Sequence, residues 1–450
     1  MNKFENNLSQ GNVVKQLIVF SFPFLLSNLI QTLYSVADMI IVGRFSGAIS
    51  MSGVNIGSQV TFLITNMVFG LSVGATVLIA QYLGAGNKTE LKETIGTLFT
   101  SLLVLALVLT VSMIVFEEPL LRLIKTPVES FAEAKNYFFI TMLGTIFIFG
   151  YNALSAVMRG MGDSKNPLVF VTIACIVNIA LDLLLVAVFK MGAGGAAIAT
   201  VASQAISMIL CIIYLKRNGF VFDFKLSSFG FQKERLKMLL KIGIPTSFQN
   251  VATSFSFLFL TALVNSLGVI ASAAVGAVGK LNGFAILPAI AMSSSISAMS
   301  AQNIGAGEEK RAVKTMKVGM LISTVISIII FLFVRFFPEL ILSVFSDDKE
   351  MIVQGAVYIK SFSFDYLIVP FVFCLNGLFV GSGHTTFSLI NGVLSSLLIR
   401  IPAAYIFGIA MGYGLWGIGL GAPIASFLSL VLGIWFYFSG KWKKPVIIHR

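Results

Sequence analysis

Charged residues are scarce in this sequence. Only 11% of its 450 residues are Asp, Glu, Lys or Arg, whereas 57% are hydrophobic. Soluble globular proteins have roughly 25% charged residues. This chain has too few charged residues for a surface that is fully exposed to water. Apolar runs of about 20 residues recur from one end to the other, which is the length that an α-helix needs to cross a bilayer. The sequence therefore predicts an all-α integral membrane protein.

Cysteine and histidine are also scarce. Cys175, Cys211 and Cys374 all lie in apolar runs and offer neither a disulfide pattern nor the paired spacing of a metal site. His384 and His449 lie too far apart to form a ligand cluster. No acidic repeat that could hold Mg²⁺ and no HExxH motif is present. These absences argue against an enzyme, and we expect no cofactor.

The apolar runs predict twelve membrane helices. Of the 31 Lys and Arg residues, 21 fall in segments on the side of the N-terminus, 8 on the other side and two within helices. Because basic residues favour the cytoplasmic side, we expect both termini in the cytoplasm. The net charge of +12 then reflects topology and not nucleic-acid binding. The predicted helices are 14–43, 50–80, 94–116, 134–157, 167–189, 192–215, 238–266, 270–301, 313–335, 352–379, 385–409 and 413–438.

The second half of the chain repeats motifs of the first. The stretch AQYLGAG at 80–86 returns as AQNIGAG at 301–307, and RGMGDS at 159–164 corresponds to VGSGHT at 380–385. Since each half holds six helices, the two halves run in the same direction. We expect two six-helix bundles related by a pseudo-two-fold axis along the membrane normal, as in parallel-repeat transporters.

The repeat defines the predicted domains. Residues 1–218 form an N-terminal lobe, 219–234 a cytoplasmic linker and 235–450 a C-terminal lobe. Pro23 and Pro245 occupy matching places near the start of the first helix of each lobe. Each proline removes a backbone hydrogen bond, so a kink is expected there. The bend is either fixed or changes during transport.

Five ionisable residues lie inside apolar spans: Asp38, Asp182, Asp365, Lys280 and Arg400. An ionisable group at membrane depth is costly, and it is expected to face a cavity or a partner and not lipid. These residues are the first candidates for function.

Several polar residues of the first lobe share one depth. At about 1.5 Å per helical residue, Asp38, Tyr137, Asp182 and Thr200 all fall in the outer half of the lobe. Asn178 precedes Asp182 by four residues, so both lie on one helix face. Hard monovalent cations favour oxygen ligands, and two neighbouring carboxylates share a proton readily because like charges repel. The set suits Na⁺, H⁺ or both, and separate structural hydrogen bonds are the alternative.

The second lobe carries a different set of charges. Arg400 lies close to the position that matches Asn178, while Lys280 and Asp365 lie in the second and fourth helices of that lobe. A structural Lys280–Asp365 pair would neutralise both charges, and the alternatives are substrate contact and proton relay. We assign Tyr34 and Asn152 of the first lobe to a candidate substrate cavity.

Several motifs resemble one known family. FPFLLSNLIQTLYSVADMIIVG, the AQYLGAG and AQNIGAG pair, RGMGDSKNP and NIALDLLLVAVFKMGAGGAAIAT resemble the multidrug and toxic compound extrusion (MATE) family. The resemblance covers nearly the whole chain. It implies an antiporter in the bacterial plasma membrane that exports cationic amphipathic compounds in exchange for Na⁺ or H⁺.

The resemblance is to the DinF-like bacterial branch. It implies a cation site, for a proton or Na⁺, at residues that match Asp38, Asn178, Asp182 and Thr200, with Tyr137 nearby. It also implies that ion binding bends the first helix at Pro23. Another bacterial branch has a glutamate in helix seven, where this chain has Thr253, and its helix-ten aspartate lies about one turn from Asp365. A coupling site in the second lobe is therefore not expected.

The predicted partners are small-molecule organic cations and the lipid bilayer. We expect no nucleic acid as a partner, and we expect a monomer. The alternative function is a flippase for a lipid-linked precursor, which would use basic residues such as Arg400 and Lys280 to bind phosphate. The acidic residues of the first lobe argue against that alternative.

Overall fold

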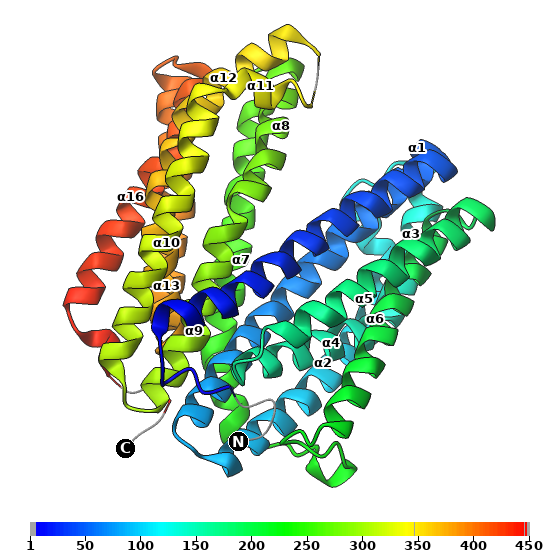
Figure 1. Cartoon of the computed structure of the whole chain (residues 1–450). Helices are drawn as coiled ribbons and strands as arrows, with labels where there is room; N and C mark the ends of the chain where they lie inside the picture. The colour runs from blue at the N-terminus through cyan, green and yellow to red at the C-terminus, as the bar shows by residue number, and fades with distance from the viewer. Residues whose placement is uncertain (1–5, 346, 445, 448–450) are drawn as a thin grey trace. The chain divides into compact units, whose positions relative to one another are not determined.

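The computed structural model describes residues 6–345, 347–444 and 446–447, and the regular elements of these residues are helices (Figure 1). From α1 to α7 they are α1 (Val13–Gly84), α2 (Lys88–Leu123), α3 (Val128–Leu143), α4 (Thr145–Gly160), α5 (Lys165–Asp182), the π-helix η1 (Leu183–Val188), α6 (Gly192–Arg217), the 3₁₀-helix η2 (Leu226–Ser228) and α7 (Lys233–Asn265). From α8 onward they are α8 (Val269–Ala285), α9 (Leu287–Gly305), α10 (Glu309–Phe336), α11 (Pro338–Leu342), α12 (Lys349–Phe362), α13 (Phe364–Gly381), α14 (Thr385–Val393), the π-helix η3 (Leu394–Arg400), α15 (Ile401–Tyr405), the π-helix η4 (Ile406–Ala410), α16 (Gly414–Phe438) and the 3₁₀-helix η5 (Lys441–Lys443).

Helix α1 contains two of the predicted spans. Its 72 residues would reach about 108 Å, far more than the roughly 30 Å of a bilayer core. Gly47 breaks the helix with a φ of 80° and a ψ of −178°, a conformation that only glycine adopts readily. The break separates the two stretches that the sequence predicts as helices 14–43 and 50–80.

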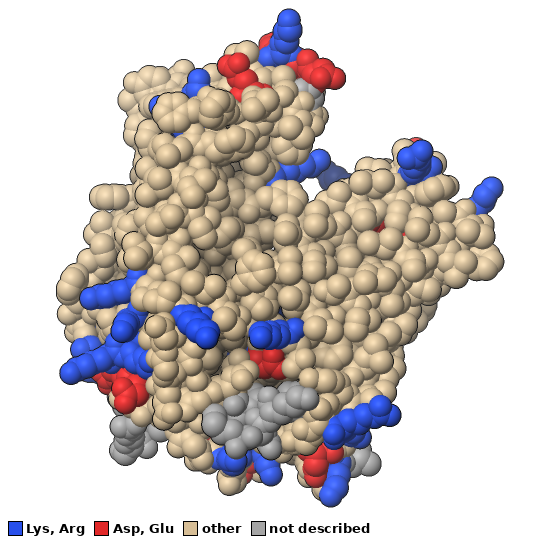
Figure 2. Space-filling model, viewed as in Figure 1, with Lys and Arg blue, Asp and Glu red and all other residues tan. Residues whose placement is uncertain are grey.

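The number of membrane spans agrees with the prediction. Among the described residues, ten helices are long and apolar enough to cross a membrane, or eleven if the bent pair α3–α4 is one span. Helix α1 is one of these, and counting its two sections separately gives twelve. The charged side chains in Figure 2 gather toward the ends of the helices, with broad uncharged surface between them. Such a surface suits contact with lipid, and the predicted helical membrane fold is confirmed.

One predicted helix is bent. The sequence predicts a single helix over 134–157, but α3 and α4 meet at Gly144 with a bend of 52°. A Cβ atom at Gly144 would clash with the side chain of Val201 in α6, so only glycine fits there. Hydrophobic periodicity continues through Gly144, which is why the pattern alone misses the bend.

The chain forms two compact units. Unit 1 contains Phe22–Ile244 together with the described residues before Leu8, and unit 2 contains Leu8–Ser21 together with the described residues from Pro245 onward. The chain therefore passes from unit 2 to unit 1 inside α1, one residue before Pro23, and returns to unit 2 inside α7 at Pro245. The predicted lobe boundaries stay a prediction.

The predicted linker is packed on unit 1. Arg235 at the start of α7 forms ion pairs with Glu90 at 2.6 Å and Glu93 at 3.3 Å, both on α2. The backbone N–H of Gln232 donates to Thr97 Oγ1 over 3.2 Å. These contacts hold residues 232–235 against α2.

The start of α1 is packed on unit 2. Leu17 and Phe20 belong to a hydrophobic core that also contains residues of α9, α10 and α13. The Arg311 guanidinium donates to the backbone carbonyls of Leu8, Gln10 and Gly11 over 2.8 to 3.3 Å. One arginine thereby orders the turn that leads into α1.

Candidate ion-coupling site

Two buried carboxyl groups form the centre of the site. Asp38 lies in α1 and is 8% exposed, and Asp182 is the last residue of α5 and is fully buried. The two carboxyl groups lie within hydrogen-bonding reach of each other. In the described part of the chain, the Oδ1 atom of each carboxyl group is buried without a hydrogen-bond partner. No Lys or Arg forms an ion pair with either of them among the described residues.

Asn178 joins the pair to α6. Helices α5 and α6 run side by side (Figure 1), and Asn178 lies one turn before Asp182. In the amide orientation that satisfies both ends, its nitrogen donates to Asp182 Oδ2 over 3.2 Å and its oxygen accepts from the Thr200 N–H over 3.2 Å. The amide therefore orients the Asp182 carboxyl group.

Two tyrosines complete the cluster. Tyr137 of α3 is buried, and its side chain lies within hydrogen-bonding reach of that of Thr200. Tyr34, one turn before Asp38 in α1, lies within electrostatic range of both carboxyl groups. The structure thus brings together the five residues that the sequence predicts for ion coupling, and it adds Tyr34 to them.

Small residues allow these helices to approach closely. A Cβ atom at Gly57 of α1 would lie 2.6 Å from the ring of Tyr137. Ala193, Ala196 and Ala197 of α6 are buried in the same hydrophobic cluster as Tyr137. This apolar shell separates the polar cluster from other polar groups and strengthens the electrostatic interactions inside it.

Some predicted site residues lie outside this cluster. Asn152 donates to the Ile148 carbonyl of its own helix over 2.8 Å and is half-buried. Helices α1 and α7 continue through Pro23 and Pro245, so the predicted bend at these prolines stays a prediction. Ser27 Oγ donates to the Pro23 carbonyl over 2.8 Å.

The charged residues of unit 2 are arranged differently. Asp365 is buried within hydrogen-bonding reach of Ser426, and its charge interacts with that of Arg400. The Arg400 guanidinium lies 5.0 Å from the centre of the Phe257 ring. Lys280 is exposed, and the described ion pairs do not include a Lys280–Asp365 pair. The basic group near Asp365 is Arg400, and the suggested Lys280–Asp365 pair does not form.

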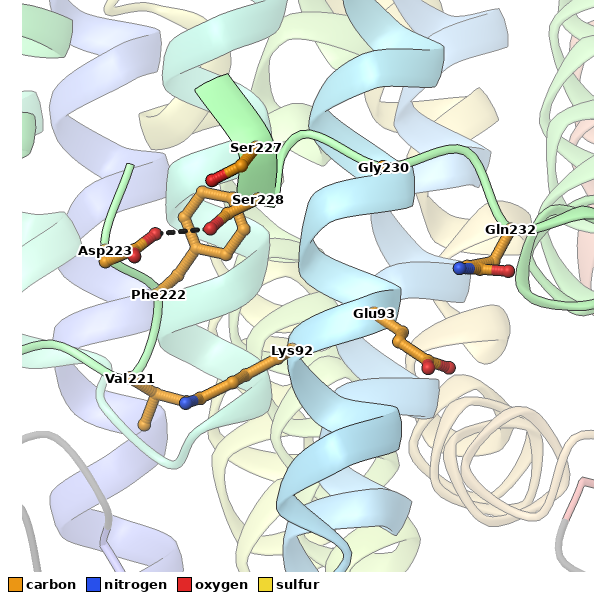
Figure 3. A pocket seen from close by; sticks show the side chains of 9 residues that line it. All are labelled: Lys92, Glu93, Val221, Phe222, Asp223, Ser227, Ser228, Gly230 and Gln232. Atoms are coloured by element: carbon orange, nitrogen blue, oxygen red, sulfur yellow. Dashed lines mark hydrogen bonds between the residues drawn. The ribbon is translucent and has the colours of Figure 1, made fainter. Parts of the chain in front are cut away.

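A separate pocket lies where the linker meets α2 (Figure 3). It has a volume of about 290 Å³, and Lys92, Phe222, Asp223 and Gln232 are among its lining residues. The hydrogen bond from Ser228 holds the pKa of Asp223 below its ordinary value. None of the predicted site residues lines this pocket.

The sequence interpretation missed Glu133. This residue lies one turn before Tyr137 in α3, and its carboxylate accepts a hydrogen bond from the first turn of α6. The signal in the sequence was the spacing of four residues to Tyr137, which places both side chains on one helix face.

Taken together, two repeated six-helix halves with a buried carboxyl pair in one of them define a membrane carrier. The chain belongs to the MatE family, because the MatE family model matches it twice, over residues 23–184 and 245–406. The double match also confirms the internal repeat. This is a transporter family, so the protein is not an enzyme, as predicted.

Similar proteins cover almost the whole chain. A "Probable multidrug resistance protein YpnP" of Bacillus subtilis is 30% identical over 441 residues, covering 97% of each chain. An "FAD transporter" of Shewanella oneidensis is 24% identical and covers 99% of this chain and 98% of its own. A solved structure of MATE in the bent conformation has a TM-score of 0.92 and 23% identity and covers 99% of each chain. The structural match supports the fold alone.

Proposed function

We propose that this protein exports cationic amphipathic compounds by antiport with protons, and that Asp38 and Asp182 form the exchange site. The observation that carries the proposal is the buried pair of carboxyl groups, within hydrogen-bonding reach of each other and without a basic partner among the described residues. The similarity to a relative named as a multidrug resistance protein supports the cargo class. We assign the chain to the DinF-like branch on the match of the five site residues.

Protons suit the arrangement better than Na⁺ does. Two carboxyl groups can hydrogen-bond to each other only if at least one of them holds a proton. The site therefore has a place for a proton as it stands. A sodium ion would need several oxygen atoms arranged around it, including the two unpartnered Oδ1 atoms and the oxygens of Asn178 and Thr200. Na⁺ stays the alternative coupling ion.

Exchange follows from competition for charge. When the site loses its proton, the carboxylates attract a cationic compound into the transport path. When a proton returns from outside, it removes that charge and the compound leaves. By linkage, each ligand weakens the binding of the other by the same factor. We propose that the protein does this by alternating access, as a monomer in the bacterial plasma membrane with both termini in the cytoplasm.

Export of a phosphate-bearing compound is the second candidate. Arg400 Nε and Nη1 are buried without hydrogen-bond partners in the described residues, and a guanidinium binds phosphate well. One relative is named as an FAD transporter. A flippase for a lipid-linked precursor would share this chemistry.

Ethidium transport in proteoliposomes tests the proposal. Wild-type protein should move ethidium when a proton gradient is imposed, and Asp38→Asn should abolish that movement because the asparagine cannot exchange a proton. Glu129→Gln, an exposed carboxylate of α3, is the matched control and should transport normally. Ethidium movement driven by a sodium gradient alone would identify Na⁺, and not H⁺, as the coupling ion. Undiminished transport by Asp38→Asn would remove the carboxyl pair from the mechanism.

A further inference from the structure

Glu133 supplies a cap to a helix that lacks its own. Helix α6 begins at Gly192, and the preceding residue, Met191, makes no side-chain capping hydrogen bond. The first N–H groups of a helix have no partner within it and carry partial positive charge. Glu133 Oε2 of α3 accepts a hydrogen bond from the Ala193 N–H over 2.7 Å. A carboxylate from one helix therefore fixes the start of another.

Close packing holds Glu133 in place. A Cβ atom at Gly192 would lie 2.8 Å from Glu133 Oε2, and Gly192 also has a φ of +58°. A Cβ atom at Gly53 of α1 would lie 2.6 Å from the Cβ of Glu133. Glycines on both sides thus allow α1, α3 and α6 to meet around this one carboxylate.

The same two helices meet again at the ion site. Tyr137 follows Glu133 by four residues in α3, and Thr200 follows Ala193 by seven residues in α6, so each residue lies on the same face as its predecessor. The side chains of Tyr137 and Thr200 lie within hydrogen-bonding reach of each other. Thr200 also donates its N–H to Asn178, which orients Asp182. The contact of Glu133 with Ala193 therefore lies on the same pair of helix faces as the approach of Tyr137 to Thr200.

We propose that Glu133 is a positioning residue for the proton site. This inference rests on the proposed function. In it, Glu133 holds α6 so that Thr200, Asn178 and Tyr137 keep water away from the two carboxyl groups. If the contact is lost, α6 can shift and water can enter. Water stabilises the ionised carboxylates, so a higher proton concentration is then needed to displace the bound compound.

Three variants separate positioning from general damage. Glu133→Ala removes the acceptor, whereas Glu133→Gln keeps an oxygen that accepts from Ala193. Glu129→Ala changes an exposed carboxylate one turn earlier in α3 and serves as the control. The measurement is the proton concentration at half-maximal release of ethidium in proteoliposomes, together with the thermal unfolding midpoint of each variant.

Glu133→Ala should need about tenfold more protons for half-maximal release, which is the lower end of the effect measured when residues that support metal ligands are removed. Glu133→Gln should stay close to wild type, and so should Glu129→Ala. An unchanged half-maximal proton concentration in a folded Glu133→Ala would overturn the inference. So would a shift in Glu133→Gln as large as that in Glu133→Ala, since Gln keeps the acceptor. Failure of the proposed function would give a different result. Wild-type protein would then show no proton-driven release of ethidium, or the Asp38→Asn variant would still show it.

Discussion

The two halves of this protein share one fold but carry opposite chemistry at matching positions. The matched ranges 23–184 and 245–406 are equally long, so aligning their ends pairs residues 222 apart near the two ends of the first half. Between those ends, the motifs at 80–86 and 159–164 have their counterparts 221 residues on. The first half has carboxyl and hydroxyl groups at Asp38, Asp182 and Thr200. In the register of the two ends, the second half has apolar side chains at Leu260, Ala404 and Ala422, and all three belong to one hydrophobic core cluster.

Backbone geometry supports this register beyond the ends of the matched ranges. Gly192 and Gly414 are counterparts, and their φ values are +58° and +56°. Lys190 and Gly412 are also counterparts, and their φ values are +53° and +73°. The same turn therefore precedes α6 in the first half and α16 in the second.

The comparison separates side chains that both halves share, which the fold accommodates in either half, from side chains that occur in the first half alone. A buried tyrosine is present in both halves, as Tyr137 and as Tyr358, which lies 221 residues on in the register of the repeated motifs, so this side chain is compatible with either chemistry. The carboxyl pair occurs in the first half alone among the matched positions. The second half is built with apolar side chains at these three positions. The fold therefore does not require the acids of the first half, whose burial without full hydrogen bonding costs free energy.

Replacing three polar residues of the first half with the apolar residues found at the matching positions of the second half should have the largest effect. Asp38→Leu, Asp182→Ala and Thr200→Ala together should abolish proton-driven ethidium transport, because no exchangeable group remains. The free energy of unfolding should rise by about 1–3 kcal/mol, since buried polar atoms without partners are removed. Transport assays and thermal unfolding in detergent check both effects. A triple variant that still transports would contradict the assignment of coupling to the first half.

Removing the charges of the second half should affect stability and not coupling. Arg400→Met leaves Asp365 buried without its positive neighbour and should destabilise the protein, while adding Asp365→Asn should recover most of the loss. A double-mutant cycle should give an interaction energy of about 1 kcal/mol. Asp365→Asn alone should keep proton-driven transport. Loss of coupling in that single variant would place an exchange site in the second half as well.

A small change beside Tyr137 should affect packing and leave the charges of the site unchanged. Gly57→Ala places a methyl group 2.6 Å from the ring and should cost about 1–3 kcal/mol of stability through overpacking. Gly279→Ala in the second half meets no atom within 4 Å and should change stability by less than about 0.5 kcal/mol. Thermal unfolding of the two variants under one set of conditions measures the difference. Equal effects would show that the packing around Tyr137 is looser than these distances indicate.

Much of the candidate site could be predicted from depth and periodicity. Asp38, Asn178, Asp182 and Thr200 lie in regular helices, where a rise of about 1.5 Å per residue converts sequence position into depth. Charged residues inside apolar runs stand out because so few are present. The membrane fold followed from the same scarcity of charge.

Other features depend on contacts between distant segments. The bend lies at Gly144, which packs closely against Val201. Hydrophobic periodicity does not predict such a contact between distant residues. In the sequence, Glu133 is an ordinary acidic residue near a helix end, and its role depends on the contact with Ala193, 60 residues away. The passage of the chain between units beside Pro23 and at Pro245 depends on which residues pack together. The sequence leaves a Lys280–Asp365 pair open as one alternative, whereas in the structure the charge that interacts with Asp365 is that of Arg400.

Proton release on binding of ethidium is the most direct test of the central claim. Purified protein in detergent and weakly buffered solution should release about one proton for each ethidium bound, because the two ligands compete for one carboxyl pair. The Asp38→Asn, Asp182→Asn double variant should release none. Wild-type protein that binds ethidium without releasing protons would contradict exchange at Asp38 and Asp182.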